Sequence, residues 1–496
     1  MLFNSYIFIF VFLPLCLIGF YILQNRQATL TKVWLTCFSL WFYGYFNQYY
    51  LLIMVCSIIG NYFIHSLLVK TRAKDISLHK RNDKMILITG VAINLLILFY
   101  FKYYDFFIEN INTLFGSSFS MKHILLPLGI SFFTFQQISF LVDTYRGELD
   151  SCSFIDYALF VSFFPQLIAG PIVVHEEMLP QFSRIGKDTR SKEEKAELFT
   201  RGIYVFVLGL AKKVLIADTF GVAVDLVYSN VSAINGFESL ITIIFYSLQL
   251  YFDFSGYCDM AKGIAGMFGM TIVNNFNSPY KATNIVEFWK RWHITLSRFF
   301  TKNIYIPLGG NRKGEGRMYL NYLIVFFLSG LWHGAGWNFI LWGMMHGVLY
   351  VLTKWWINKK KTSVIKPLAC VLTFVYVSIA WVYFRAASVE QANILLTNIY
   401  TKPWALPGTG FTDAFNLGEF WYILKILKVA TLPYAQYYIM ILFSAFALVI
   451  TFFGKNIDEL AAKFKPTVLN ASVTAILFLW CVVSLSGVST FLYFNF

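Results

Sequence analysis

The sequence has few charged residues and a particular scarcity of acidic ones. Only 13% of its 496 residues are charged, whereas 58% are hydrophobic and 19% are aromatic. The core of a water-soluble domain does not need so large an apolar share, so the composition excludes a soluble protein and predicts that a lipid bilayer is its solvent. The sequence has 26 acidic residues and 40 Lys and Arg residues, which gives a formal net charge of +14.

Cysteine is scarce as well, and the cysteines present have no pairing pattern. No CxxC motif occurs and no His/Cys spacing suits zinc. We therefore expect buried packing residues, without disulfide bonds and without a structural metal. The seven cysteines are residues 16, 37, 56, 152, 258, 370 and 481.

The chain also lacks a long hydrophilic stretch that could form a separate soluble domain. Apolar runs long enough to cross about 30 Å of hydrocarbon recur from end to end, and they predict about ten or more spans. The first run, Tyr6 to Leu23, has no preceding positive charge and no small-residue cleavage pattern after it, so we expect a retained span. The sequence thus predicts one all-α membrane domain over residues 1–496.

The basic residues are clustered between the hydrophobic runs. Lys70 to Lys84 and Arg184 to Arg201 hold six each, Lys290 to Arg317 holds seven, and Lys354 to Lys366 holds five. Such clusters indicate cytoplasmic loops rather than a nucleic-acid surface. Threading the spans through these segments predicts that both termini are extracytoplasmic.

Two central apolar runs break this alternation of spans. Leu125 to Val142 and Tyr157 to Val174 both contain proline and cannot both cross the membrane while Arg184 to Arg201 stays inside. Non-helical backbone at membrane depth is tolerated only where protein or a watery cavity surrounds it. We therefore expect at least one re-entrant segment and a central cavity. The nearby Lys212 and Lys213 suggest a tilted or interfacial segment.

The first of two histidine-centred stretches runs from Phe288 to Phe300 and contains His293. Its aromatic and aliphatic residues alternate with cations at helical spacing, which predicts one amphipathic helix at the inner membrane surface. A plain interfacial anchor, with His293 as one more polar tip, explains the pattern equally well.

The second stretch runs from Ser329 to Phe339 and joins two apolar runs. A helix that starts near Arg317 at the inner surface reaches roughly 20 Å by His333, which places this histidine inside the membrane thickness. Glycines around it allow a tight turn, and Trp332 and Trp337 would enclose this turn. An ionisable residue is costly there unless it functions. A packing histidine is the alternative, which suits His346 better.

These two stretches, with Tyr305 to Gly314 and Phe164 to Ile172, resemble the membrane-bound O-acyltransferase (MBOAT) family. The resemblance covers nearly the whole chain. Its length and both termini are more similar to the bacterial alginate-type acetylation proteins and peptidoglycan O-acetylation proteins than to the shorter D-alanyl transferases of teichoic acids.

The resemblance implies a ring of helices around a thinned centre and a tunnel that joins a cytoplasmic donor to an external acceptor. His333 matches the family's motif histidine and His293 its second histidine. Acetyl-CoA would be the donor co-substrate, with no permanently bound cofactor. A separate extracytoplasmic protein would complete the transfer to polysaccharide. Membrane lipid and, indirectly, the polysaccharide acceptor are the other partners that we expect, without nucleic acid.

The chemistry agrees with this resemblance. Acyl transfer from a thioester to a hydroxyl needs a base with a near-neutral pKa, and histidine is the side chain suited to this role. No Gly-x-Ser-x-Gly motif occurs, which favours direct transfer over an acyl-serine intermediate. The candidates for tunnel and substrate contacts are Trp332, Trp337, Asn338, Ser329, Asp253, Ser255, Gln137 and Gln166. Each polar one could equally form an interhelical hydrogen bond.

Basic residues near the motifs are candidates for the donor phosphates. Glycines and cations in Gly309 to Gly314 suit an anion, although contact with anionic lipid explains this run better. The candidates are Arg291, Arg298, Arg312 and Lys313.

Three other functions are compatible with parts of the sequence. A D-alanyl transferase fed by a carrier protein shares the motifs. A transporter or channel would also use many spans and buried Asp or His, but no internal repeat is apparent. An inactive scaffold for polymer assembly is the third alternative. For the favoured acetyltransferase we expect the bacterial cytoplasmic membrane.

Overall fold

The computed structural model describes residues 1–24, 26–72, 79–360, 365–416, 418–429, 432–487 and 491–492. Regular structure in these residues is helical, without a strand. The chain folds into two compact units. Unit 1 comprises Met1–Ile203 and Ala261–Val273, and unit 2 comprises Tyr204–Met260 and Asn274–Phe496.

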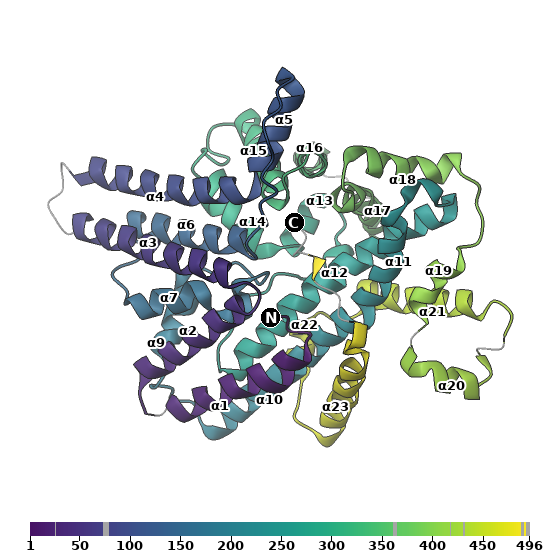
Figure 1. Cartoon of the computed structure of the whole chain (residues 1–496), viewed down its shortest axis with the longest axis horizontal. Coiled ribbons are helices and arrows are strands. Elements are labelled where there is room, and N and C mark those ends of the chain that lie inside the picture. Colours follow the sequence, from purple (N-terminus) through teal and green to yellow (C-terminus); the bar gives the residue numbers. More distant parts are fainter. Residues whose placement is uncertain are drawn as a thin grey trace. The chain divides into compact units, whose positions relative to one another are not determined.

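Unit 1 contains the N-terminal helices, of which α3, α4 and α6 pack side by side (Figure 1). Helix α2 packs on α1 and α7. The helices of this unit are η1 (Phe8–Phe12), α1 (Leu13–Leu23), α2 (Ala28–Gly44), α3 (Gln48–Arg72), α4 (His79–Lys102), α5 (Tyr104–Phe115), α6 (Ile130–Arg146), α7 (Phe154–Ser162), α8 (Phe164–Leu167) and α9 (His175–Ser183). Helix α10 (Lys192–Ala211) begins in unit 1 and ends in unit 2.

Two runs of unit 1 test the predicted spans. Residues 157–174 are divided among α7, α8 and a non-helical segment, so this run is not one continuous helix, and its re-entrant course stays a prediction. Helix α4 ends at Lys102 and α5 starts at Tyr104, so the candidate span of this region is Asn82–Lys102. The Asp105 carboxylate accepts hydrogen bonds from the N–H groups of Lys122 and Ile124, which ties the first turn of α5 to the following loop.

Unit 2 contains both histidine-centred stretches. Its elements before them are η2 (Lys212–Ala217), α11 (Asp218–Ser229), η3 (Val231–Ala233), α12 (Gly236–Met267, whose end lies in unit 1) and η4 (Pro279–Lys281). The stretches themselves form α13 (Ile285–Arg291), α14 (Ile294–Phe300), η5 (Thr301–Tyr305), α15 (Glu315–His333) and α16 (Trp337–Lys360). The remaining elements are α17 (Lys366–Arg385), α18 (Val389–Thr401), α19 (Thr409–Thr412), η6 (Asp413–Phe415), η7 (Gly418–Phe420), α20 (Trp421–Ile426), α21 (Ala435–Phe453), α22 (Ile457–Lys463), α23 (Val468–Val483) and η9 (Ser484–Gly487).

The core of unit 2 is built largely from aromatic rings. Trp381 stacks on Trp342 with ring centroids 5.5 Å apart, and Trp292 lies 5.0 Å from Trp381. Such rings bury a large apolar area with few rotatable bonds, so they fix the relative position of the helices that carry them. Helices α13, α16 and α17, which surround the two histidines, are joined in this way.

Among the described residues, four helices are long and apolar enough to cross a membrane: Gln48–Arg72, Asn82–Lys102, Lys366–Arg385 and Ala435–Phe453. Phe8–Leu23 and Val468–Val483 are apolar but shorter. Large apolar side chains on these helices are exposed, for example Leu442, Phe453 and Ile476. A protein whose exposed surface is this apolar is suited to lipid, as a multi-pass membrane protein is.

Candidate active site

The hairpin of α15 and α16 positions His333. Helix α15 ends at this histidine, Gly334 is extended and α16 starts at Trp337, which confirms the predicted tight turn. The two helices are in close contact because glycines face each other: a methyl group added at Gly343 would overlap the backbone oxygen of Phe326, and one added at Gly334 would overlap the Phe339 ring.

The His333 imidazole is enclosed by aromatic rings. Its centroid lies 5.0 Å from Trp342, 5.1 Å from Phe384 and 4.7 Å from Trp332. The residue is only 4% exposed. The sequence predicts an imidazole that lines an open passage, but in this conformation the ring is packed against protein.

His293 lies at a break in the backbone and not within one helix. The predicted single amphipathic helix over 288–300 is wrong: α13 ends at Arg291, His293 has the left-handed angles φ 44° and ψ 53°, and α14 starts at Ile294. The break turns the histidine inward, so that it is 0% exposed. Its ring centroid is 6.4 Å from that of His333, and the two histidines thus come together from separate segments.

Asn275, which the sequence analysis missed, holds this break in place. Its side-chain oxygen is 3.2 Å from Nδ1 of His293, and it accepts hydrogen bonds from the N–H and hydroxyl of Thr295 at 3.1 and 2.9 Å. Its backbone oxygen accepts the Ile294 N–H. No local pattern reveals such a residue, because it lies 18 positions before its histidine.

The other residues of the α15–α16 motif differ in their roles. Ser329 is buried one turn before His333, and Trp332 is buried beside it. Asn338 donates hydrogen bonds to the backbone oxygens of Tyr383 and Ala386, which attaches the start of α16 to the end of α17. Trp337 is 60% exposed, so it does not enclose the turn together with Trp332 as predicted.

Asp253 and Ser255 lie buried on α12. Asp253 forms an ion pair with Lys213 at 2.6 Å and accepts the N–H of Leu492 at 3.1 Å. Its carboxylate therefore balances a buried charge, which is a structural contact.

Gln137 and Gln166 lie in unit 1 and make interhelical contacts there. Gln137 accepts a hydrogen bond from Ser57 of α3, and Gln166 donates one to the Phe160 backbone oxygen of α7. These contacts match the packing alternative that the sequence left open for both residues.

A cavity of about 450 Å³ lies among α13, α14, η5, α15 and α16. Ser329 and Ser297 are among its polar lining residues, and Lys290 and Arg298 are its cations. Trp289, Phe326, Tyr322 and Tyr350 contribute aromatic walls. An elongated, mostly apolar group with an anionic end would suit this combination. His333 follows Ser329 by one turn of α15.

Arg298 is the candidate for donor phosphates that lines this cavity. Arg291 instead donates two hydrogen bonds to Glu287. Burial alone would raise the pKa of Glu287, but hydrogen bonds from Thr283 and Arg291 outweigh it, so the pKa lies below its usual value. Glu287 is therefore a carboxylate that occupies Arg291. Arg312 and Lys313 are exposed in the turn before α15.

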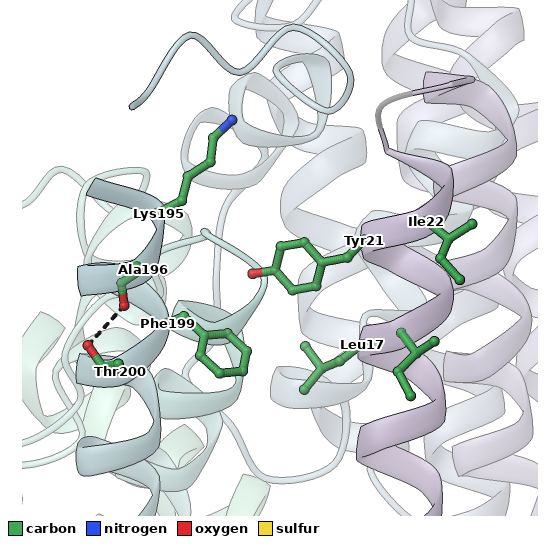
Figure 2. Close-up of a pocket in the computed structure, with 8 residues that line it drawn as sticks. Leu17, Tyr21, Ile22, Lys195, Ala196, Phe199 and Thr200 are labelled. Carbon is green, nitrogen blue, oxygen red and sulfur yellow. Dashed lines mark hydrogen bonds between the residues drawn. The ribbon is translucent and has the colours of Figure 1, made fainter. Parts of the chain in front are cut away.

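A different hollow lies between α1 and α10 in unit 1 (Figure 2). Leu17, Tyr21 and Ile22 form one side, Phe199 and Thr200 the other. The Thr200 hydroxyl donates to its own helix at Ala196. The surface of this hollow is suited to hydrocarbon and offers no base for acyl chemistry.

No cluster of three or more His, Cys, Asp or Glu in the described part of the chain could hold a metal ion. All seven cysteines are free thiols.

The family described as MBOAT, membrane-bound O-acyltransferase, matches residues 141–390. This range includes both histidines, Asn275 and the cavity.

Curated relatives cover most of the chain. A peptidoglycan O-acetyltransferase of Helicobacter pylori is 43% identical in an alignment of 422 positions that covers 79% of this chain and 78% of the relative. A probable alginate O-acetylase of Pseudomonas aeruginosa is 35% identical over 88% of this chain and 82% of its own length. A teichoic acid D-alanyltransferase of Bacillus subtilis is 30% identical over 52% of this chain and 68% of its own.

Proposed function

The chain belongs to the membrane-bound O-acyltransferase family and is an acyltransferase, and from this premise we propose that it transfers acetyl groups from cytoplasmic acetyl-CoA for O-acetylation of an extracytoplasmic polysaccharide. The acceptor would be peptidoglycan or an alginate-like exopolysaccharide, as in the names of its relatives. The proposal rests chiefly on one observation, the approach of the two buried histidines to 6.4 Å beside the cavity.

The proposed reaction is a direct transfer. The acceptor hydroxyl gives its proton to a histidine nitrogen while its oxygen bonds to the thioester carbonyl carbon. The carbon–sulfur bond then breaks, and the CoA thiolate takes up the proton, so that the histidine becomes neutral again. We assign this role of base, or the positioning of the acyl group, to His333, with His293 assisting it.

The cavity of about 450 Å³ is the proposed route of the donor. The pantetheine arm would lie along its apolar walls, with the CoA phosphates near Arg298 and Lys290. Because aromatic rings enclose His333, some of these rings must move when the thioester arrives. Gating of this kind also protects a thioester from water.

The remaining parts of the proposal concern the whole protein. We infer a location in the bacterial cytoplasmic membrane with both termini outside, and a ring of about ten or more spans around a tunnel, as the apolar runs predict. A separate extracytoplasmic protein would hand the acetyl group to the polysaccharide.

The test uses purified full-length protein in detergent with labelled acetyl-CoA. We expect turnover of the thioester that falls about 10²- to 10⁴-fold in His333→Asn, the contribution typical of a general base. His123→Asn is the matched control, because His123 is an exposed histidine and should keep the wild-type rate. A folded His333→Asn variant with full turnover would contradict the proposal, as would ion flux without acyl chemistry.

A D-alanyl transfer remains the second candidate because the D-alanyltransferase relatives share part of the chain. Acetyl is favoured because the acetylating relatives are more identical and cover more of it. Ester-linked acetate and D-alanine on each envelope polymer, measured with and without the gene, distinguish the two. Loss of D-alanine alone would support the second candidate.

A further inference from the structure

The side-chain oxygen of Asn275 is a shared acceptor at the break between α13 and α14. Three groups meet it: the Thr295 N–H at 3.1 Å, the Thr295 hydroxyl at 2.9 Å and Nδ1 of His293 at 3.2 Å. All are buried. A contact of this kind fixes not only the position of the imidazole but also its protonation pattern.

The hydrogen-bonding capacity of each group determines where the imidazole proton lies. A backbone N–H can only donate, so the Asn275 atom that faces Thr295 must be the amide oxygen. This oxygen can only accept, and therefore Nδ1 of His293 must carry a proton to bond with it. The Asn275 amide nitrogen lies instead toward the Cys258 sulfur, at 3.6 Å. In a neutral imidazole the other nitrogen, Nε2, then carries the lone pair.

The surroundings prevent the ring from exchanging its two nitrogens easily. His293 is 0% exposed, and the Phe254 ring packs edge-on at 4.9 Å. The backbone is fixed on both sides, since the Asn277 N–H donates to Arg291 and the Ile294 N–H donates to Asn275. A ring flip would require this part of the core to open.

We propose that Asn275 is a positioning residue that holds His293 in the tautomer with its proton on Nδ1, so that Nε2 is the nitrogen available for acyl transfer. The proposal rests on the proposed function for the role of His293. In that reaction His333 takes the proton of the acceptor hydroxyl as the acyl carbon–oxygen bond forms, and the thiolate recovers this proton as the carbon–sulfur bond of the thioester breaks. His293 assists through Nε2, which can accept a hydrogen bond from the reacting groups while Nδ1 keeps its proton throughout.

The first test reads the tautomer itself. Full-length protein with ¹⁵N-labelled histidine, in nanodiscs, is studied by NMR, and the His293 signals are assigned by their loss in His293→Gln. We expect Nδ1 protonated and Nε2 unprotonated in the wild type, and a mixture of tautomers in Asn275→Leu. A proton on Nε2 in the wild type, or an unchanged tautomer in Asn275→Leu, would overturn the proposal.

The second test links the tautomer to turnover. Asn275→Asp retains the shape and an acceptor oxygen, whereas Asn275→Leu retains only approximate size. We expect Asn275→Leu to lower kcat at least tenfold with little change in KM, and Asn275→Asp to retain more activity. Thr295→Val is the local control, because it removes one donor to the same oxygen but leaves the His293 bond. Equal losses in all three variants would indicate packing and contradict the proposal.

Failure of the tautomer proposal can be distinguished from failure of the proposed function. The NMR measurement needs no acyl donor. If the wild type shows the expected tautomer but no thioester turnover, the proposed function is refuted, whereas the role of Asn275 in holding the ring stands.

Discussion

At the residue scale, Lys213 explains why Asp253 of α12 can be buried. Its amino group lies 2.6 Å from Asp253 and 2.7 Å from Asp218, and its side chain is 2% exposed. Two carboxylates and one backbone N–H, that of Leu492, thus share one buried site. Charges without such partners would be expensive in this environment.

We predict that Lys213→Met lowers the free energy of unfolding by about 3–5 kcal/mol, because it leaves buried carboxylates without their counter-charge. Thermal unfolding of the detergent-solubilised protein measures this loss. Lys212→Met is the matched control: its side chain is 21% exposed and pairs with Asp259 alone, so its effect should be smaller. A larger loss in Lys212→Met would contradict this account of the cluster.

Arg298 distinguishes the proposed donor cavity from the exposed basic turn. We predict that Arg298→Gln raises the KM for acetyl-CoA about tenfold, because a charged hydrogen bond contributes about 1.5–3 kcal/mol, while kcat changes little. Steady-state turnover with labelled acetyl-CoA measures both constants. Arg312→Gln, an exposed site outside the cavity, should leave them unchanged. If Arg312→Gln raises the KM and Arg298→Gln does not, the phosphate site lies at the exposed turn instead of in the cavity.

Single residues show where sequence interpretation succeeds. His333 stands out because an ionisable residue among glycines and tryptophans has a strong local signal. Its place at a turn after α15 agrees with the structure, whereas its role in acyl transfer stays a prediction. Asn275 has no such signal, since its importance comes from contacts with His293 and Thr295 across a break in the chain. The sequence suggests a tilted or interfacial segment at Lys212 and Lys213, but it does not reveal their ion pairs with Asp259 and Asp253, because these aspartates lie far along the chain on α12.

At the element scale, the close contact of α15 and α16 determines where His333 lies. A methyl group at Gly343 would collide with backbone, whereas nothing lies near a methyl group at Gly316 at the start of α15. We predict that Gly343→Ala costs about 1–3 kcal/mol through overpacking and lowers acyl transfer, since the helices must separate beside the active site.

The matched substitution Gly316→Ala should leave stability unchanged or raise it by up to about 1 kcal/mol, because alanine favours helix. Thermal unfolding and turnover of both variants are measured together. An unaffected Gly343→Ala variant would show that the hairpin adapts, and that its glycines do not control the position of His333.

Helix boundaries show the limits of periodicity. Residues 288–300 have the spacing of one amphipathic helix, yet they form α13 and α14 with a left-handed residue between them. At this break Asn275 accepts the N–H groups of Ile294 and Thr295, and the Asn277 N–H donates to Arg291. These tertiary hydrogen bonds outweigh the local preference for continuing the helix. By contrast, the irregular backbone in residues 157–174 was predictable, because proline and the charge of the next loop left no room for a full span.

At the scale of the whole molecule, apolar composition and exposed apolar helices agree, so the membrane class was predictable from the sequence. The number of spans was not predictable from the sequence. Hydropathy alone does not distinguish short or broken apolar segments, such as α7, α8 and α23, from full spans. The basic loops predict an orientation of the chain, and this prediction can be tested directly.

We predict that Lys313 is cytoplasmic and Tyr400 extracytoplasmic, because the first lies in a strongly basic segment and the second in one with a single basic residue. Both are exposed, Tyr400 by 88%. A membrane-impermeant maleimide should label Tyr400→Cys in intact spheroplasts and Lys313→Cys only after permeabilisation, with the unsubstituted protein as the control for its seven cysteines. If Lys313→Cys is labelled from outside, the cavity beside Arg298 would open away from acetyl-CoA, and the proposed direction of transfer would have to be reversed.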